Sequence, residues 1–263
     1  MKRLALAFLH WSILCLPLAI AFAETPAPEK FQLFLLAGQS NMAGRGALDA
    51  DTAKANPRVL KWTVENQWAP AAEPLHWDKV GAGAGLAKPF AEILVEKDPA
   101  ITVGLIPTAC GGSPIRTWVP GGFHDQTKSH PYDDALARAK AAMSSGMLKA
   151  ILWHQGESDA NPKSTADYEQ KLKELIERFR KDLGMPDLPV YIGQLGRFPE
   201  KPWNEYQEAI DQAQQRVAAS VPHVYFISSE GLLSKGDSLH FSTEALRTFG
   251  QRYAEADLKN QGK

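Results

Sequence analysis

Three residues from opposite ends of the chain have the side-chain types of a nucleophile and its base. Ser40 lies in the segment GQSNM at positions 38–42, directly after the apolar run 31–37. Asp237 and His240 stand three positions apart near the C-terminus. A histidine whose second ring nitrogen is held by a carboxylate can take the proton of a serine hydroxyl and make it nucleophilic. These residues are therefore candidates for nucleophilic catalysis.

Each of the two segments also has an ordinary structural interpretation. Serine and asparagine after a strand are typical of a turn or a helix cap, and Met42 stands where a Gly-x-Ser-x-Gly elbow has its second glycine. The segment 237–240 can be a polar loop that caps a helix beginning near Ser242. Neither segment alone indicates catalysis over a structural role, but together they supply the three members of a catalytic triad.

A glycine pair marks a third segment, because Gly111 and Gly112 follow the apolar run 102–106. Glycine permits close approach of the backbone and an outward-facing amide, which can stabilise an oxyanion. Such a pair is also typical of a simple turn.

A fourth segment, HQGESD at positions 154–159, follows the apolar run 150–152. Gln155 can donate its side-chain amide to an oxyanion, and Glu157 can position a group or the substrate. His154 can be a ligand or a base, but a histidine hydrogen-bonded within the structure is the favoured interpretation. A polar segment after an apolar strand is typical of a ligand site.

Short apolar runs alternate with amphipathic stretches along the chain. The runs predict strands at 31–37, 59–62, 102–106, 150–154, 190–194 and 223–227. The amphipathic stretches predict helices at 84–97, 133–145, 168–183, 203–220 and 242–258. This alternation predicts right-handed crossovers and a three-layer α/β/α sandwich with a mostly parallel sheet. The segments 65–83 and 111–131 are predicted to be loops.

The helix 168–183 has clear signals at both ends. Ser164 and Asp167 have the spacing of a capping box that precedes it. Gly184 is predicted to end it, because glycine readily adopts the left-handed conformation of a helix terminus.

The N-terminal 23 residues have the pattern of a cleaved signal peptide. Lys2 and Arg3 precede an apolar run at 4–22, which closes on Ala-Phe-Ala at positions 21–23. A membrane anchor and lipidation of Cys15 are the alternatives. We expect a mature chain of residues 24–263 that forms a single domain and is periplasmic or secreted.

Composition restricts the partners of this chain. The formal net charge of the 263 residues is −1, which indicates neither a nucleic-acid nor an anionic-membrane partner. Of two cysteines, only Cys110 lies outside the predicted signal peptide, so the mature chain is predicted to have no internal disulfide. The sequence carries no indication of an oligomeric state.

The motif set GQSNM at 38–42, Gly111-Gly112, HQGE at 154–157 and Asp237-x-x-His240 resembles the SGNH hydrolase superfamily. More narrowly, it is similar to the sialate O-acetylesterase-like branch that includes carbohydrate esterase family six, the acetylxylan esterases. The resemblance covers essentially all of residues 24–263. It implies a flavodoxin-like α/β/α sandwich around a mostly parallel, five-stranded sheet.

The resemblance also implies roles for single residues. Ser40 would be the nucleophile, with His240 as its base and Asp237 beside the histidine. The amides of Ser40 and Gly112 would form the oxyanion hole, with Gln155 in the place where the superfamily has its asparagine.

Other residues of the motifs have less defined roles. Glu157 is kept as a supporting residue or as the alternative triad acid. Gln39, Asn41 and Trp118 are candidates for contacts with the substrate.

The expected function is therefore an exported serine esterase that removes acetyl groups from a carbohydrate, such as acetylated xylan or sialic acid. No metal and no cofactor are expected, because His76, Asp78, His124 and Asp125 lie in loops without a recognisable ligand set. After signal cleavage no membrane contact is expected. The alternatives are an SGNH esterase or lipase acting on other acyl esters, and a non-catalytic carbohydrate-binding protein of the same fold.

Overall fold

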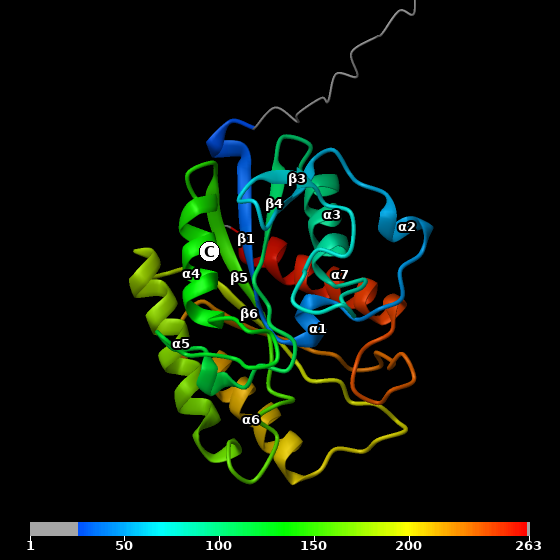
Figure 1. The fold of residues 1–263 in the computed structure, drawn as a ribbon, viewed down its shortest axis with the longest axis vertical. Helices are drawn as coiled ribbons and strands as arrows, with labels where there is room; N and C mark the ends of the chain where they lie inside the picture. The colour runs from blue at the N-terminus through cyan, green and yellow to red at the C-terminus, as the bar shows by residue number, and fades with distance from the viewer. Residues whose placement is uncertain (1–25, 262–263) are drawn as a thin grey trace, which may run out of the picture.

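A computed structural model describes residues 26–261, so the predicted signal peptide lies outside the described residues. Figure 1 shows a central sheet with helices on both sides. The sheet has seven strands in the order β3-β2-β4-β1-β5-β6-β7. The strands are β1 (Phe31–Gly38), β2 (Val59–Trp62), β3 (Trp68–Pro70), β4 (Thr102–Pro107), β5 (Met147–His154), β6 (Val190–Gly193) and β7 (Val224–Ile227).

All neighbouring strands pair in parallel except β3, which pairs antiparallel to β2. The α/β/α class is confirmed, but the five-stranded sheet is wrong. All six predicted runs form strands, and the short edge strand β3 lies in a segment predicted to be a loop. It is held there by aromatic packing, since the ring of Trp68 lies 4.9 Å from that of Trp62 and 4.7 Å from that of Phe31.

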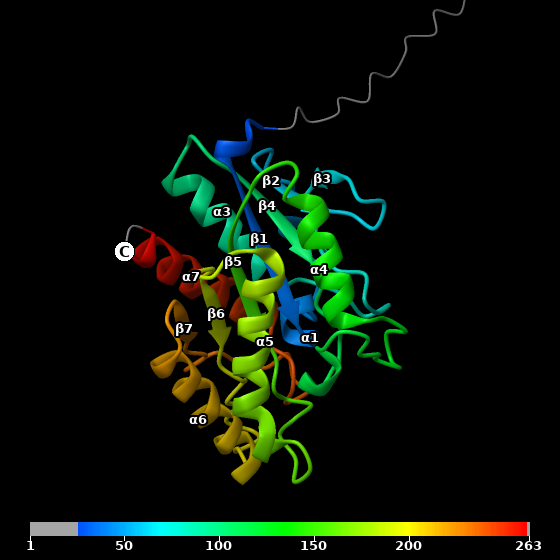
Figure 2. The same ribbon diagram turned by 90° about the vertical axis from the view of Figure 1, so that its left-hand side faces the viewer.

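The helices form the outer layers of the sandwich. They are α1 (Ser40–Ala43), α2 (Ala50–Ala53), α3 (Ala87–Lys97), α4 (Pro131–Ala142), α5 (Tyr168–Leu183), α6 (Glu205–Ser220) and α7 (Thr243–Asn260). Short 3-10 helices lie at Pro28–Lys30, Ile115–Thr117 and Thr165–Asp167. In Figure 2, α3 and α7 lie on one side of the sheet, and α4 and α5 lie on the other. Within residues 26–261, no helix has the length and apolar character needed to cross a membrane.

Strand β1 is buried on both faces because successive side chains of a strand point to opposite sides. Leu33 and Leu35 belong to the core cluster that includes residues of α4, α5 and α6. Phe34 and Leu36 belong to the second cluster, with residues of α3 and α7. The continuous apolar run therefore places β1 at the centre of the sheet, where its carboxyl end adjoins those of β4 and β5.

The ends of α5 agree only in part with the sequence signals. Gly184 adopts the predicted left-handed conformation, with φ 70°, and ends the helix. The predicted capping box is wrong, because Ser164 makes no side-chain capping bond. A 3-10 turn occupies this position instead, and the Asp167 carboxylate lies 3.3 Å from the Lys171 ammonium.

Candidate active site

Residues from the N-terminal and C-terminal parts of the sequence lie together at the carboxyl end of β1. Ser40 is the first residue of α1, and its Oγ lies 3.0 Å from Nε2 of His240. His240 Nδ1 lies 2.7 Å from Oδ2 of Asp237. These are the distances of hydrogen bonds from hydroxyl to imidazole and from imidazole to carboxylate. The three residues thus form a continuous chain from a hydroxyl through a base to an acid.

The loop at 237–240 determines the protonation states of Asp237 and His240. Oδ1 of Asp237 accepts hydrogen bonds from the backbone amides of Leu239, at 3.0 Å, and His240, at 2.7 Å. Burial alone would raise the pKa of Asp237, but these bonds and the imidazole lower it to about 2. Burial lowers the pKa of His240 below its usual 6.5, although Asp237 opposes this shift. At neutral pH the imidazole is therefore uncharged, donates from Nδ1 to Asp237 and can accept from Ser40.

The side chain of Asn41 connects the segment that carries Ser40 to the segment of Glu157 and to the loop of His240. Its Nδ2 donates to Glu157 Oε1, at 2.7 Å, and to the carbonyl of Leu239, at 3.1 Å. Its Oδ1 accepts from the backbone amide of Phe241, at 3.2 Å. The side chain is buried, and both of its N–H groups are used. The structure thus contradicts the expected substrate contact and gives Asn41 a role in holding the loops together.

Two backbone amides near Ser40 are open to an oxyanion. Within residues 26–261, neither the Ser40 nor the Gly112 amide donates to a protein acceptor. Gly112 has φ 83°, a left-handed conformation that favours glycine. Its carbonyl accepts from Ser158 Oγ, at 3.0 Å, which fixes the orientation of this turn. These amides can therefore stabilise negative charge that develops on a bound carbonyl oxygen.

Gln155 does not extend into this site. The residue is fully buried, and its Nε2 donates to Asp159 Oδ2, at 2.6 Å, and to the Ser113 carbonyl, at 3.1 Å. Both hydrogens of the amide are used by these acceptors. The expected oxyanion role of Gln155 is therefore wrong in this structure. Gln155 instead ties the segment after β5 to the loop after β4.

Two other candidates for substrate contact are also buried. Gln39 Oε1 accepts from the backbone amide of Ser158, at 3.2 Å, and thus links the segments after β1 and β5. Trp118 donates from Nε1 to Ser113 Oγ, at 3.0 Å, and packs edge-to-face against Trp153. The expected substrate contact of Trp118 is wrong, because its side chain is used in the interior. The Nε2 group of Gln39 donates to no acceptor among the described residues, so its substrate contact stays a prediction.

Glu157 and Asp237 are clearly distinguished by their contacts. Asp237 holds the Nδ1 atom of His240, whereas Glu157 accepts from Asn41. The second carboxylate oxygen of Glu157 is buried without a hydrogen-bond partner among the described residues. Burial raises the pKa of Glu157 to about 7. The geometry therefore favours Asp237 as the triad acid and Glu157 as a support of Asn41.

His154 was expected to be hydrogen-bonded within the structure, and this is wrong. Neither ring nitrogen has a hydrogen-bond partner among the described residues. Burial lowers the pKa of His154 to about 3, so the ring is neutral. It packs against Phe241 and Phe249, with ring centroids 5.7 and 5.6 Å apart. His154 thus packs as an apolar side chain and takes no part in proton transfer.

Two hollows border the site on either side of the segment 157–158. One, of about 180 Å³, is lined by Glu157 and Leu239 among other residues. The other, of about 630 Å³, is lined by Gly112 and Ser158 among others. Within residues 26–261, no group of three or more histidine, cysteine, aspartate or glutamate side chains is arranged to hold a metal ion.

Comparison with known proteins identifies the family. Residues 30–259 match the family described as carbohydrate esterase, sialic acid-specific acetylesterase. The chain belongs to this family. The predicted resemblance to the sialate O-acetylesterase-like branch is thereby confirmed, while the narrower grouping with the acetylxylan esterases stays a prediction.

Relatives of this carbohydrate esterase cover almost all of its chain. A probable carbohydrate esterase of Arabidopsis thaliana is 33% identical over an alignment of 261 positions, which covers 90% of this chain and 94% of that protein. The crystal structure of the Arabidopsis protein superposes with a TM-score of 0.76 at 30% identity, over 87% of this chain and 98% of that one. NanS has the same fold, with a TM-score of 0.72 at 20% identity over 89% and 98% of the two chains.

The separate contacts of the two carboxylates predict different effects of their replacement. Asp237→Asn preserves shape but disturbs the tautomer of His240, so turnover should fall by roughly 10⁴-fold, as in a serine protease. Glu157→Gln keeps an acceptor for Asn41 and should lower turnover much less. Steady-state kinetics on an acetyl ester, with folding checked by circular dichroism, measures both. A larger loss in Glu157→Gln would make Glu157 the triad acid.

Proposed function

We propose that this carbohydrate esterase is an exported serine esterase that hydrolyses O-acetyl esters of a carbohydrate through an acetyl-serine intermediate. The observation that carries the proposal is the 3.0 Å contact between Ser40 Oγ and His240 Nε2, with Asp237 on the other side of the ring. Export is proposed from the signal-peptide pattern of residues 1–23.

The geometry supports a two-step reaction. His240 Nε2 takes the hydroxyl proton as Ser40 Oγ attacks the acetyl carbonyl carbon, and the amides of Ser40 and Gly112 bind the oxyanion. The bond to the sugar oxygen breaks, and His240 returns the proton to the leaving alcohol. A water molecule, deprotonated by the same imidazole, then hydrolyses the acetyl-serine ester and restores the free enzyme. Asp237 stabilises the imidazolium in both steps.

The larger hollow supports an acidic sugar as substrate. It adjoins the oxyanion turn at Gly112, and its lining carries the cationic side chains of Arg116 and Lys163, together with Lys171, which is paired with Asp167. Asp125 is the single carboxylate in the same lining. An excess of positive charge favours a ligand with a carboxylate. We therefore propose an acetylated sugar of the sialic acid type over acetylated xylan, which has a neutral backbone.

Ser40→Ala tests the proposed chemistry. The small hydroxyl contributes little to packing, so the variant should fold normally yet release no acetate above background from acetylated sugars. A fluorophosphonate should modify the parental protein at Ser40, as found by mass spectrometry, and should leave the variant unmodified. Turnover near the parental rate in Ser40→Ala, or an adduct on another residue, would overturn the serine mechanism.

Arg116→Gln tests the proposed preference for an acidic sugar. Removing one exposed cation weakens attraction to a carboxylate, so kcat/KM for acetylated sialic acid should fall several-fold. The value for acetylated xylan should stay the same, because a neutral sugar gains nothing from the charge. Lys140→Gln, which removes an exposed cation on α4 outside this lining, is the matched control. Equal losses on both substrates, or faster parental hydrolysis of xylan, would contradict an acidic substrate.

A further inference from the structure

The oxyanion turn is held by an ion pair that does not touch the triad. Arg45 Nη2 lies 2.6 Å from Asp78 Oδ2, and both side chains are largely buried, at 8% and 4% exposed. The same Asp78 oxygen accepts from the backbone amide of Gly111, at 2.8 Å. Arg45 also donates from Nη1 to the carbonyl of Gly44, at 2.7 Å, where α1 ends. The pair thus connects the helix that begins with Ser40 to the residue preceding Gly112.

The three connected segments are separate in the chain. Arg45 follows α1, Asp78 lies in the connection between β3 and α3, and Gly111 follows β4. A Cβ atom on Gly111 would collide with Arg45 Nη2 and would lie 2.7 Å from Asp78 Oδ2. A glycine at position 111 is therefore needed for the ion pair to approach the backbone so closely.

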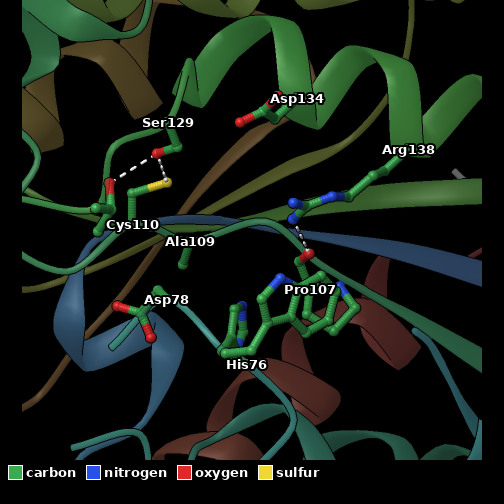
Figure 3. Close-up of a pocket in the computed structure, with 10 residues that line it drawn as sticks. His76, Asp78, Pro107, Ala109, Cys110, Ser129, Asp134 and Arg138 are labelled. Carbon is green, nitrogen blue, oxygen red and sulfur yellow. Dashed lines mark hydrogen bonds between the residues drawn. The ribbon is translucent and has the colours of Figure 1, made fainter. Parts of the chain in front are cut away.

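Side-chain packing gives the turn little support on this side. A cavity of about 90 Å³ lies there, lined by Asp78, Cys110, His76, Arg138 and other residues. Figure 3 shows Asp78 and His76 on one side of this cavity, Cys110 and Ser129 on another, and Arg138 extending from α4. Because protein atoms do not fill this cavity, hydrogen bonds contribute to the position of the turn; besides the Asp78 contact, Nε2 of His124 lies 3.2 Å from the Gly111 carbonyl.

We propose that Asp78, itself fixed by Arg45, is a positioning residue that sets the Gly112 amide in place relative to Ser40. The inference rests on the proposed function, since it assumes that the Gly112 amide meets the oxyanion. Asp78 touches neither the substrate nor the reacting atoms and acts through the backbone of Gly111. Asp78 supplies the acceptor for the Gly111 amide, and Arg45 restricts the Asp78 side chain because it pairs with the same carboxylate oxygen.

Loss of Asp78 would release the turn for two physical reasons. The Gly111 amide would lose its acceptor, and Arg45 would remain as a buried cation without its carboxylate. Misplacement of a catalytic group by about 1 Å can cost on the order of 100-fold in rate. The oxyanion forms only after the substrate is bound, so the loss should appear in kcat and not in KM.

The test compares Asp78→Ala with Asp78→Asn. Asp78→Ala should lower kcat for an acetyl ester by about 10- to 100-fold, with KM changed less than two-fold. Asp78→Asn keeps an acceptor for the Gly111 amide and should retain more activity. Titration of active sites with a fluorophosphonate corrects each rate for misfolded protein.

Asp257→Asn is the matched control. Asp257 carries a buried carboxylate on α7, about 20 Å along the helix from its start near the site. This variant should keep the parental kcat. A loss in Asp78→Ala that disappears after correction for active sites, or a raised KM with unchanged kcat, would overturn the positioning role.

Hydrogen exchange tests the same contact without relying on activity. In Asp78→Ala, deuterium uptake in the segment 109–113 should rise, while uptake should stay parental in Asp257→Asn. Unchanged uptake in this segment would overturn the proposal even if the variant were slow. Parental protein without esterase activity would refute the proposed function, and the exchange result would still show whether Asp78 holds the turn.

Discussion

The side chain of Asn41 donates hydrogen bonds to Glu157 and to the backbone of Leu239, and it accepts one from the backbone of Phe241. It stands next to Ser40, while Leu239 and Phe241 stand on either side of His240. The buried amide therefore connects the nucleophile's helix to both neighbours of the base. Because Ser40 and His240 are 200 positions apart, their 3.0 Å contact depends on this connection. Burial makes the amide costly to leave unpaired, which favours one arrangement of the loops.

The sheet brings these loops to the same place. Gly38 ends β1 with φ 126°, and its Cα lies so close to the backbone of His154 that no Cβ would fit. The Gly38 carbonyl also accepts from the Cys110 amide, at 2.9 Å, which brings in the segment after β4. The segments that carry Ser40, Gly112 and Glu157 therefore leave three adjacent parallel strands at one edge, as expected for a ligand site in such a fold, while the loop of Asp237 and His240 follows β7. Backbone contacts thus bring the segments after β1, β4 and β5 together, and the Asn41 side chain adds the loop of His240.

Sequence patterns predicted the strands well because they depend on local apolar runs such as 31–37. They also predicted the juxtaposition of Ser40, Asp237 and His240, since residue type and spacing carry that signal. The edge strand β3 escaped prediction because it depends on the packing of Trp68. The roles of Gln155 and Trp118 were predicted wrongly, because burial of these side chains depends on contacts between distant segments, such as Gln155 with the Ser113 carbonyl and Trp118 with Trp153. Asp78 gave no such signal, because its contacts with Arg45 and with the Gly111 amide exist only in the folded chain.

The proposed mechanism requires a neutral His240 as the base for Ser40. The pH dependence of kcat/KM on an acetyl ester tests it most directly, since this profile reports the ionisation of the essential base in the free enzyme. Burial holds the pKa of His240 below its usual 6.5. The acid limb of the profile should therefore be a single ionisation with its midpoint below pH 6.5, and it should be unchanged in Glu157→Gln. A fall centred near pH 7, where Glu157 has its pKa, that disappears in Glu157→Gln would contradict the account.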